Sequence, residues 1–328
     1  MAAVRFSDIM PTLEEERSMR VYRMLPVALT ALFAGCSGDS VSTAVSPAPH
    51  AAMRWVNAVP DTMPMDYRIV DVVTNANEPN IAYRGSSGGY RQVPPGQHHI
   101  RVFPSGSTAA ACNGPSVVSQ ILLDTTLTFA VNHYYTVLHA GYMKSGASPK
   151  QRLVVTDDIF PANVAGKMNV RVGNAFANAA DVFVASATAA GGVVAPPASF
   201  TGLAFGAYSA YTPLNTAPTT PATSSYRVTA TAAGTTTPLL ADGLLPIGTP
   251  AFAGSLTVPA LNAVAGTQQD GSVLTSIVTP PAVSYTLTSS GSATSCPPAG
   301  TQTVVAGTAT GAVVTFIDKN PSDKLLGQ

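Results

Sequence analysis

Short runs of alternating apolar and polar residues recur along residues 53–156, and turns rich in glycine and proline separate them. In residues 134–140, Tyr135 and Val137 fall on one face of an extended chain, and the residues between them fall on the other face. The pattern predicts strands over residues 53–57, 65–72, 98–103, 127–131, 134–140 and 152–156. No capped helical periodicity follows the N-terminal segment. Short strands at this spacing predict an all-β chain made of antiparallel β-sandwiches.

The outline of the first half of the chain recurs in the second half, with longer loops. The recurring landmarks pair Arg54 with Arg171, Asn57 with Asn174, Asp66 with Asp181, Tyr90 with Tyr208, Tyr135 with Tyr285, and Asp157-Asp158 with Asp318. The extra residues are rich in Thr, Pro and Ala, as in residues 216–223, and such insertions suit surface loops. We therefore expect two tandem domains, residues 52–161 and 168–321, with a linker at 162–167 and a tail at 322–328.

A set of motifs in the first half is Asn57-Ala58, Pro60-Asp61, Asp66-Tyr67, Tyr90 with Val93-Pro94-Pro95-Gly96, Tyr135-Thr136-Val137 and Asp157-Asp158. In this order they resemble the domain-of-unknown-function 4397 family, DUF4397, which is found in bacterial exported and cell-surface proteins. The second half resembles the family loosely, because it lacks the Pro-Gly turn and the paired aspartates. The resemblance implies an immunoglobulin-like sandwich in each of two tandem copies, and it implies no established reaction.

The N-terminal segment has an apolar run at residues 25–35 that follows the basic stub at 20–23 and ends at Cys36. About a dozen apolar residues suit a signal-peptide core and fall short of the roughly 20 that a membrane-spanning helix needs. The order of basic stub, apolar run, small residues and cysteine resembles a bacterial lipoprotein signal, with residues 1–35 as leader and 36–51 as a flexible tether. The resemblance implies a lipid on Cys36 and a place at the outer membrane or cell surface. A secretory peptide cut near Ala44, or an apolar segment without a role in export, is the alternative.

The composition is poor in charge, with 17 basic and 17 acidic residues among 328. Nucleic-acid binding needs a basic surface, so we do not expect nucleic acid as a partner. His98 and His99 are adjacent and would point to opposite faces of a strand, while His133 and His139 would lie about 20 Å apart on one strand. We therefore expect neither a metal ion nor another cofactor.

The sequence contains no Gly-x-Ser-x-Gly, Walker or dinucleotide-binding pattern. Asp157 and Asp158 are the acids that a hydrolase would use together with a histidine. Adjacent acids on an extended chain diverge, so we expect a strand-ending turn there and a chain that is not an enzyme. Asp66 and Asp181 are expected to hold a turn or a backbone amide by side-chain hydrogen bonds.

Two cysteines, Cys112 and Cys296, remain if Cys36 carries lipid. In an oxidising compartment a disulfide between the two halves and a pair of free thiols both stay open.

Sandwich domains commonly bind through end loops, so we expect contacts from loops 85–90, 94–98 and 107–115. The candidate contact residues are Tyr90, Pro95, Gly96 and His98. The composition and the resemblance together favour a non-catalytic module that sits on a membrane through its lipid and binds an envelope protein or a glycan, or acts as a spacer. A carbohydrate-binding module with exposed aromatic side chains, and a hydrolase using Asp157 or Asp158, are the alternatives.

Overall fold

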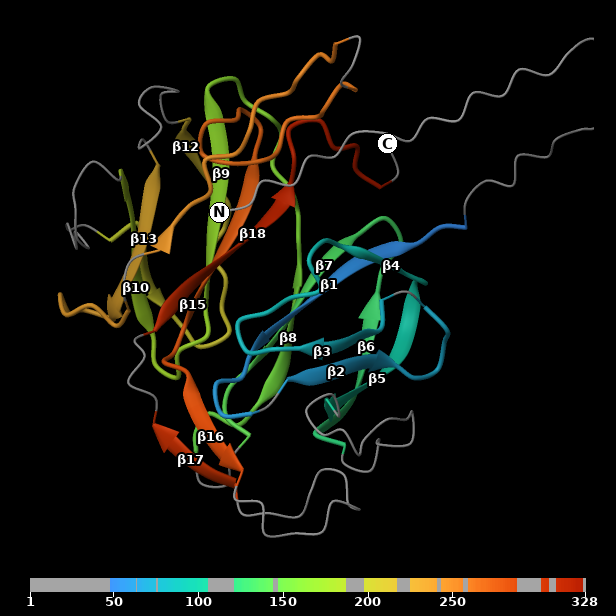
Figure 1. Cartoon of the computed structure of the whole chain (residues 1–328), viewed down its shortest axis with the longest axis vertical. Coiled ribbons are helices and arrows are strands. Elements are labelled where there is room, and N and C mark those ends of the chain that lie inside the picture. The colour runs from blue at the N-terminus through green and yellow to red at the C-terminus, as the bar shows by residue number, and fades with distance from the viewer. Residues whose placement is uncertain are drawn as a thin grey trace, which may run out of the picture. The chain divides into compact units, whose positions relative to one another are not determined.

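The computed structural model describes residues 48–62, 64–74, 76–105, 121–143, 147–186, 198–216, 225–240, 243–255, 259–287, 302–306 and 311–326. In these ranges every regular element is a β-strand (Figure 1). They all belong to one compact unit, Pro47–Gln328. The leader, Cys36, Cys112, Cys296 and the loop at 107–115 lie outside the described residues.

The first half forms two four-stranded sheets with the orders β4-β1-β7-β8 and β3-β2-β5-β6. The strands are β1 (Ala51–Ala58), β2 (Met65–Ile69), β3 (Glu78–Ile81), β4 (Arg91–Val93), β5 (Gly96–Pro104), β6 (Leu123–Phe129), β7 (Tyr134–Ala140) and β8 (Arg152–Asp157). Strands β1 and β7 are parallel, and the other neighbours are antiparallel. The predicted strand at 127–131 begins earlier, at Leu123, because its alternation of polar and apolar residues extends back through the Thr-rich run.

The core of the first half lies between its two sheets. Met53 and Trp55 on β1 face Tyr67 on β2 and Ile100 on β5, and all four are fully buried. The rings of Trp55 and Tyr67 stack with their centroids 4.9 Å apart. Because every second residue of each strand enters this shared core, the first half is a β-sandwich, as the alternation predicted.

The second half also has two four-stranded sheets, with the orders β12-β9-β15-β18 and β11-β10-β13-β14. The strands are β9 (Lys167–Asn174), β10 (Ala180–Ser186), β11 (Phe200–Leu203), β12 (Thr212–Asn215), β13 (Tyr226–Ala232), β14 (Gly243–Leu244), β15 (Val273–Thr279) and β18 (Ala312–Lys319). A hairpin of β16 (Val283–Leu287) and β17 (Gln302–Ala306) is inserted between β15 and β18. The second half has a separate core, which includes Met168, Val170, Val228 and Leu274. The strand order of the first half therefore recurs, with β9 in the place of β1 and β15 in the place of β7.

The register differs from the sequence pairing at two tyrosines. Residue 285 lies on the inserted hairpin, so the counterpart of β7 is β15, and Thr275 corresponds to Thr136. Tyr211, not Tyr208, directly precedes the edge strand β12, as Tyr90 directly precedes β4. The sequence pairing failed here because the Gly-x-Tyr motif at Tyr208 and the Tyr-Thr motif at Tyr285 match those of the first half without holding the same positions in the sheet.

Strand β1 is buried along its whole length, on both faces. Its second face, with β7, packs against the second face of β9 and β15 in an apolar cluster that includes Val56, Leu138 and Ile277. A simple alternation of buried and exposed residues is therefore lost in the central strands, because each is covered from both sides.

Candidate functional site

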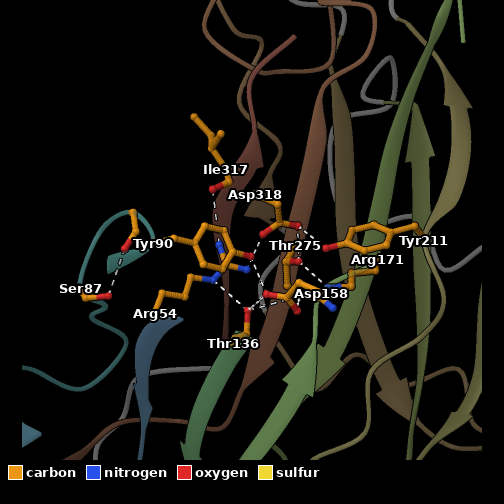
Figure 2. Close-up of polar contacts among 11 residues, drawn as sticks. Arg54, Ser87, Tyr90, Thr136, Asp158, Arg171, Tyr211, Thr275, Ile317 and Asp318 are labelled. Atoms are coloured by element: carbon orange, nitrogen blue, oxygen red, sulfur yellow. Dashed lines mark hydrogen bonds and ion pairs between the residues drawn. The ribbon is translucent and has the colours of Figure 1, made fainter. Parts of the chain in front are cut away.

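Four charged side chains meet where the two halves touch (Figure 2). Arg54 lies on β1 and Arg171 on β9, while Asp158 directly follows β8 and Asp318 lies on β18. Arg54 pairs with Asp318, and Arg171 pairs with Asp158. Each ion pair thus joins an arginine of one half to an aspartate of the other. The exposed fraction of these side chains is 3 % for Arg171 and 0 % for the others.

Within the first half, Thr136 connects the two charges. Arg54 Nε donates to Thr136 Oγ1 at 3.0 Å, and Thr136 Oγ1 donates to Asp158 Oδ2 at 2.6 Å. Tyr90 donates its hydroxyl proton to the same Oδ2 at 2.5 Å. Asp158 is therefore held by a threonine and a tyrosine of its own half and by Arg171 of the other half.

The second half repeats these contacts with its own residues. Arg171 Nε donates to Thr275 Oγ1 at 2.7 Å, and Thr275 Oγ1 donates to Asp318 Oδ2 at 2.5 Å. The Tyr211 hydroxyl donates to Asp318 Oδ2 at 2.9 Å. A set of Arg, Thr, Asp and Tyr is thus present twice, and the arginine of each set forms its ion pair with the aspartate of the other set.

Aromatic rings cover the two guanidinium groups. Arg54 lies 4.9 Å from the ring centroid of Tyr90 and 5.2 Å from that of Phe316. Arg171 lies 4.9 Å from the centroid of Tyr208 and 4.7 Å from that of Tyr211. A desolvated guanidinium gains from such contacts, which offset part of the cost of its burial.

The electrostatics favour the charged form of both arginines. Burial by itself lowers the pKa of Arg54, but the negative charges nearby, Asp318 foremost, raise it above its ordinary value. Burial likewise opposes the charge of Arg171, and Asp158 together with Asp318 raises its pKa. Burial raises the pKa of Asp158, against the effect of the two arginines. Because Arg171, Thr136 and Tyr90 all donate to this carboxylate, we take the charged ion pair as its state at neutral pH.

A cleft of about 720 Å³ lies beside this network. It is lined by Ser86, residues 88–90, Tyr134, Phe160, Val264, the C-terminal part of β18, Asn320 and residues 323–325. Tyr134 packs against Tyr90 and Phe160, with ring centroids 5.2 and 5.0 Å away. The backbone N–H of Leu326 donates to the Tyr134 hydroxyl at 2.8 Å, and this bond holds the C-terminal segment beside the three rings. The cleft thus contains the loop at 85–90 that the sequence indicated as a binding loop.

The candidate contact residues are in different environments. Pro95 is exposed in the turn between β4 and β5, and Gly96 is exposed at the start of β5. Tyr90 lines the cleft with its hydroxyl bonded to Asp158. His98 is buried, with its ring nitrogens 2.9 Å from the Pro94 carbonyl oxygen and 3.3 Å from an Asp71 carboxylate oxygen. The His98 ring also stacks on Phe129, so it stabilises the loop from inside, and its role as a contact residue stays a prediction.

Asp157 and Asp158 diverge, as expected for adjacent residues of an extended chain. Asp157 is partly exposed, and its carboxylate lies 2.7 Å from His133 Nδ1. Asp158 is buried in the ion-pair network, a role that the expectation of a plain strand-ending turn missed. An Asp–His contact therefore exists at residue 157, while Asp158 is bonded to Arg171.

Asp66 and Asp181 hold backbone amides, and the hypothesis for these two residues is confirmed. Asp66 Oδ1 accepts a hydrogen bond from Asn80 N at 2.8 Å. Asp181 accepts hydrogen bonds from Gly234 N at 2.8 Å and Gly202 N at 2.7 Å, and these bonds lower its pKa.

Most of the network escaped the sequence reasoning. Arg54, Thr136, Arg171, Thr275, Tyr211 and Asp318 were not singled out as site residues. One signal was available, since Arg54 and Arg171 recur at matching places inside otherwise apolar strands. A charged residue in such a strand is rarely buried without a partner.

Two kinds of feature are absent from the described ranges. No three His, Cys, Asp or Glu side chains in them gather as metal ligands would. None of their elements is a helix that is long and apolar enough to cross a membrane.

Comparison with known proteins identifies a family for part of the chain. No curated protein matched it. A family model described as Domain of unknown function (DUF4397) matches residues 51–185, from the start of β1 into β10. The match includes the whole first sandwich and crosses the expected boundary at 162–167. This match agrees with the resemblance to DUF4397 that the motifs of the first half carry.

Proposed function

We propose that the chain is an exported, lipid-anchored envelope protein whose two sandwiches act together as a non-catalytic binding or structural module. The observation that carries this proposal is the reciprocal network of two arginines and two aspartates. These buried charges neutralise one another between the halves, so they serve to hold the sandwiches together. A catalytic site would instead direct such groups toward a substrate position.

The second half is, in this proposal, a loop-expanded second copy of the first. Its sheets have the same strand order, and Arg171 and Thr275 are cross-strand neighbours as Arg54 and Thr136 are. The immunoglobulin-like character of each copy belongs to the same proposal.

The anchor in this proposal is a lipid on Cys36, with residues up to 51 as the tether. Each buried CH₂ of an acyl chain contributes about 0.8 kcal/mol, so several chains hold a protein on a membrane without a spanning segment. The mass of the mature N-terminal peptide from the membrane fraction tests the anchor. A diacylglycerol on Cys36 is expected, and an unmodified terminus near Ala44 would refute it.

The cleft between residues 86–90 and β18 is the proposed contact site for an envelope protein or glycan. Gly89 lines this cleft, and a Cβ added there meets no atom within 4 Å, so Gly89→Trp fills the cleft without disturbing the fold. We expect Gly89→Trp to lose the partners that crosslinking in the native envelope identifies. The matched control is Thr128→Trp, at an exposed position of β6 away from the cleft lining. Partners that persist equally in both variants would contradict this assignment.

A carbohydrate-binding module is the second candidate, and one observation favours it. Tyr134 and Phe160 are partly exposed in the cleft, where a sugar ring would stack on them. Trp55, Tyr67 and Tyr135 are buried in the core, which argues against an aromatic platform on a sheet face. Binding of oligosaccharides that falls at least tenfold in Phe160→Ala would favour this candidate over a protein partner.

A hydrolase is the third candidate, and it rests on the contact between His133 and Asp157. Hydrolysis of ester or glycoside substrates that disappears in His133→Ala would favour it. A hydrolysis rate that is the same in His133→Ala as in the wild-type chain would exclude a hydrolase that uses this contact.

A further inference from the structure

The buried face of each sandwich presents an arginine and a threonine in the same register. Arg54 lies across from Thr136 in the β1–β7 pair, and Arg171 lies across from Thr275 in the β9–β15 pair. Asp158 follows the outer strand β8, and Asp318 lies near the end of the outer strand β18. Each half therefore presents one arginine and one aspartate at equivalent positions.

The contacts between these faces are reciprocal. Arg54 of the first half pairs with Asp318 of the second, and Arg171 of the second pairs with Asp158 of the first. The apolar cluster around them follows the same rule, since Ala58 and Ala175, as well as Leu138 and Ile277, hold equivalent positions. Reciprocal contacts of this kind are the mark of an isologous, two-fold interface, which is normally formed by two identical chains.

We infer that the face formed by β1, β7 and the end of β8 is complementary to itself. Besides the second sandwich of its own chain, it can therefore bind the same face of another copy of this chain. In such a dimer, Arg54 of each copy pairs with Asp158 of the other copy. The inference goes beyond the proposed function, because it requires neither the lipid nor a ligand.

In the intact chain, the second sandwich of the same chain covers this face. The second sandwich is tethered to the first by residues 158–166, and a short linker gives an effective concentration in the mM range. At lower protein concentrations, the second sandwich therefore outcompetes a second chain. Weakening the contact within the chain, while leaving the first face unchanged, is expected to favour exchange between chains.

The test is the double variant Arg171→Asp with Asp318→Arg in the full chain. It places like charges opposite Arg54 and Asp158 inside one chain and leaves the first face as it was. Like-charge contacts at an interface are strongly unfavourable, whereas the pairing of Arg54 with Asp158 of a second copy remains available. We expect the solution mass from light scattering to at least double relative to the wild-type chain, with an unchanged circular dichroism spectrum.

The matched control adds Arg54→Asp and Asp158→Arg to the double variant. Opposite charges then face each other within one chain again, so the mass should return to that of the wild-type chain. A folded double variant that keeps the wild-type mass would overturn the inference. Should the double variant lose its circular dichroism spectrum, Asp318→Arg alone decides by the same readout, since it retains the pair between Arg171 and Asp158.

Discussion

The change Arg54→Ala should strongly destabilise the protein, because Arg54 belongs to a fully buried ion pair. The side chain is 0 % exposed and donates to Asp318, to Thr136 Oγ1 at 3.0 Å and to the Ile317 carbonyl oxygen at 3.4 Å. Its removal leaves the Asp318 carboxylate buried without its guanidinium partner. Only the hydroxyl donors Thr275 and Tyr211 would still hold that carboxylate.

The expected loss in the free energy of unfolding follows from this burial. Removing one partner of a buried ion pair costs about 3–5 kcal/mol, because the remaining charge stays in a medium of low polarity. At about 1.4 kcal/mol for each tenfold change, the unfolding equilibrium shifts by roughly two to three and a half orders of magnitude. The double variant Arg54→Ala with Asp318→Ala leaves no unpaired charge at this pair, so it should lose less than the sum of the two single variants.

Urea unfolding with two probes measures this loss and locates it. Trp55 is the only tryptophan of the chain and is buried in the first sandwich, so its fluorescence reports that half. Far-ultraviolet circular dichroism reports both halves. We expect the two transitions to coincide in the wild-type chain and to separate in Arg54→Ala, because weaker coupling lets the sandwiches unfold independently.

The matched control is Arg91→Ala, which breaks a surface pair. Arg91 Nε lies 2.8 Å from Glu78, and the two side chains are 46 % and 17 % exposed. Exposed pairs contribute about 0.2–1 kcal/mol. If Arg54→Ala costs no more than Arg91→Ala and its two transitions still coincide, the reasoning from buried charge is refuted.

Three further predictions concern pH, packing and loops. Burial lowers the pKa of His139 from 6.5 to about 4, against a weaker effect of its hydrogen bond with Gln151. The unfolded chain therefore takes up a proton that the folded chain excludes, so stability is complete above pH 6.5 and falls by about 2–3 kcal/mol as the pH approaches 4. The urea midpoint should fall less from pH 7 to pH 4.5 in His139→Gln than in the wild-type chain. Equal falls in the two proteins would contradict this role of His139. Gly173→Ala places a Cβ 2.7 Å from the Tyr208 ring in the interface, so its thermal midpoint should fall by several degrees, and an unchanged midpoint would count against tight packing there. Asp181→Ala loses hydrogen bonds to two loop amides and should cost about 1 kcal/mol, with faster hydrogen exchange at Gly202 and Gly234; unaltered exchange at both amides would refute this role.

The positions of six of the eight strands in the first half could be predicted from the sequence, because the alternation that marks a strand is local; β3 and β4 were missed. Strand β7 was predicted with its observed ends, and β1, β2, β5 and β8 with small shifts. The roles of two aspartates were also accessible, since Asp66 and Asp181 accept hydrogen bonds from amides of the neighbouring edge strands β3 and β11.

The pairing of the second half was only partly accessible. Short motifs at Tyr208 and at Tyr285 of the inserted hairpin imitate those at Tyr90 and Tyr135, so a comparison of motifs pairs the wrong tyrosines. Register depends on hydrogen bonds between β9, β12 and β15, whose residues lie far apart in the sequence. A comparison of motifs contains no information about these bonds.

The sequence by itself determined the all-β fold class, the two-part outline and the resemblance of the first half to DUF4397, because strand periodicity, turn residues and short motifs are read from neighbouring positions. Only the tertiary structure decided what the isolated charges in β1 and β9 do. Arg54 and Asp318 are 264 residues apart, and nothing along the chain says that they touch. A buried charge is tolerated where its partner reaches it, and that partner is supplied by the packing of one sandwich on the other.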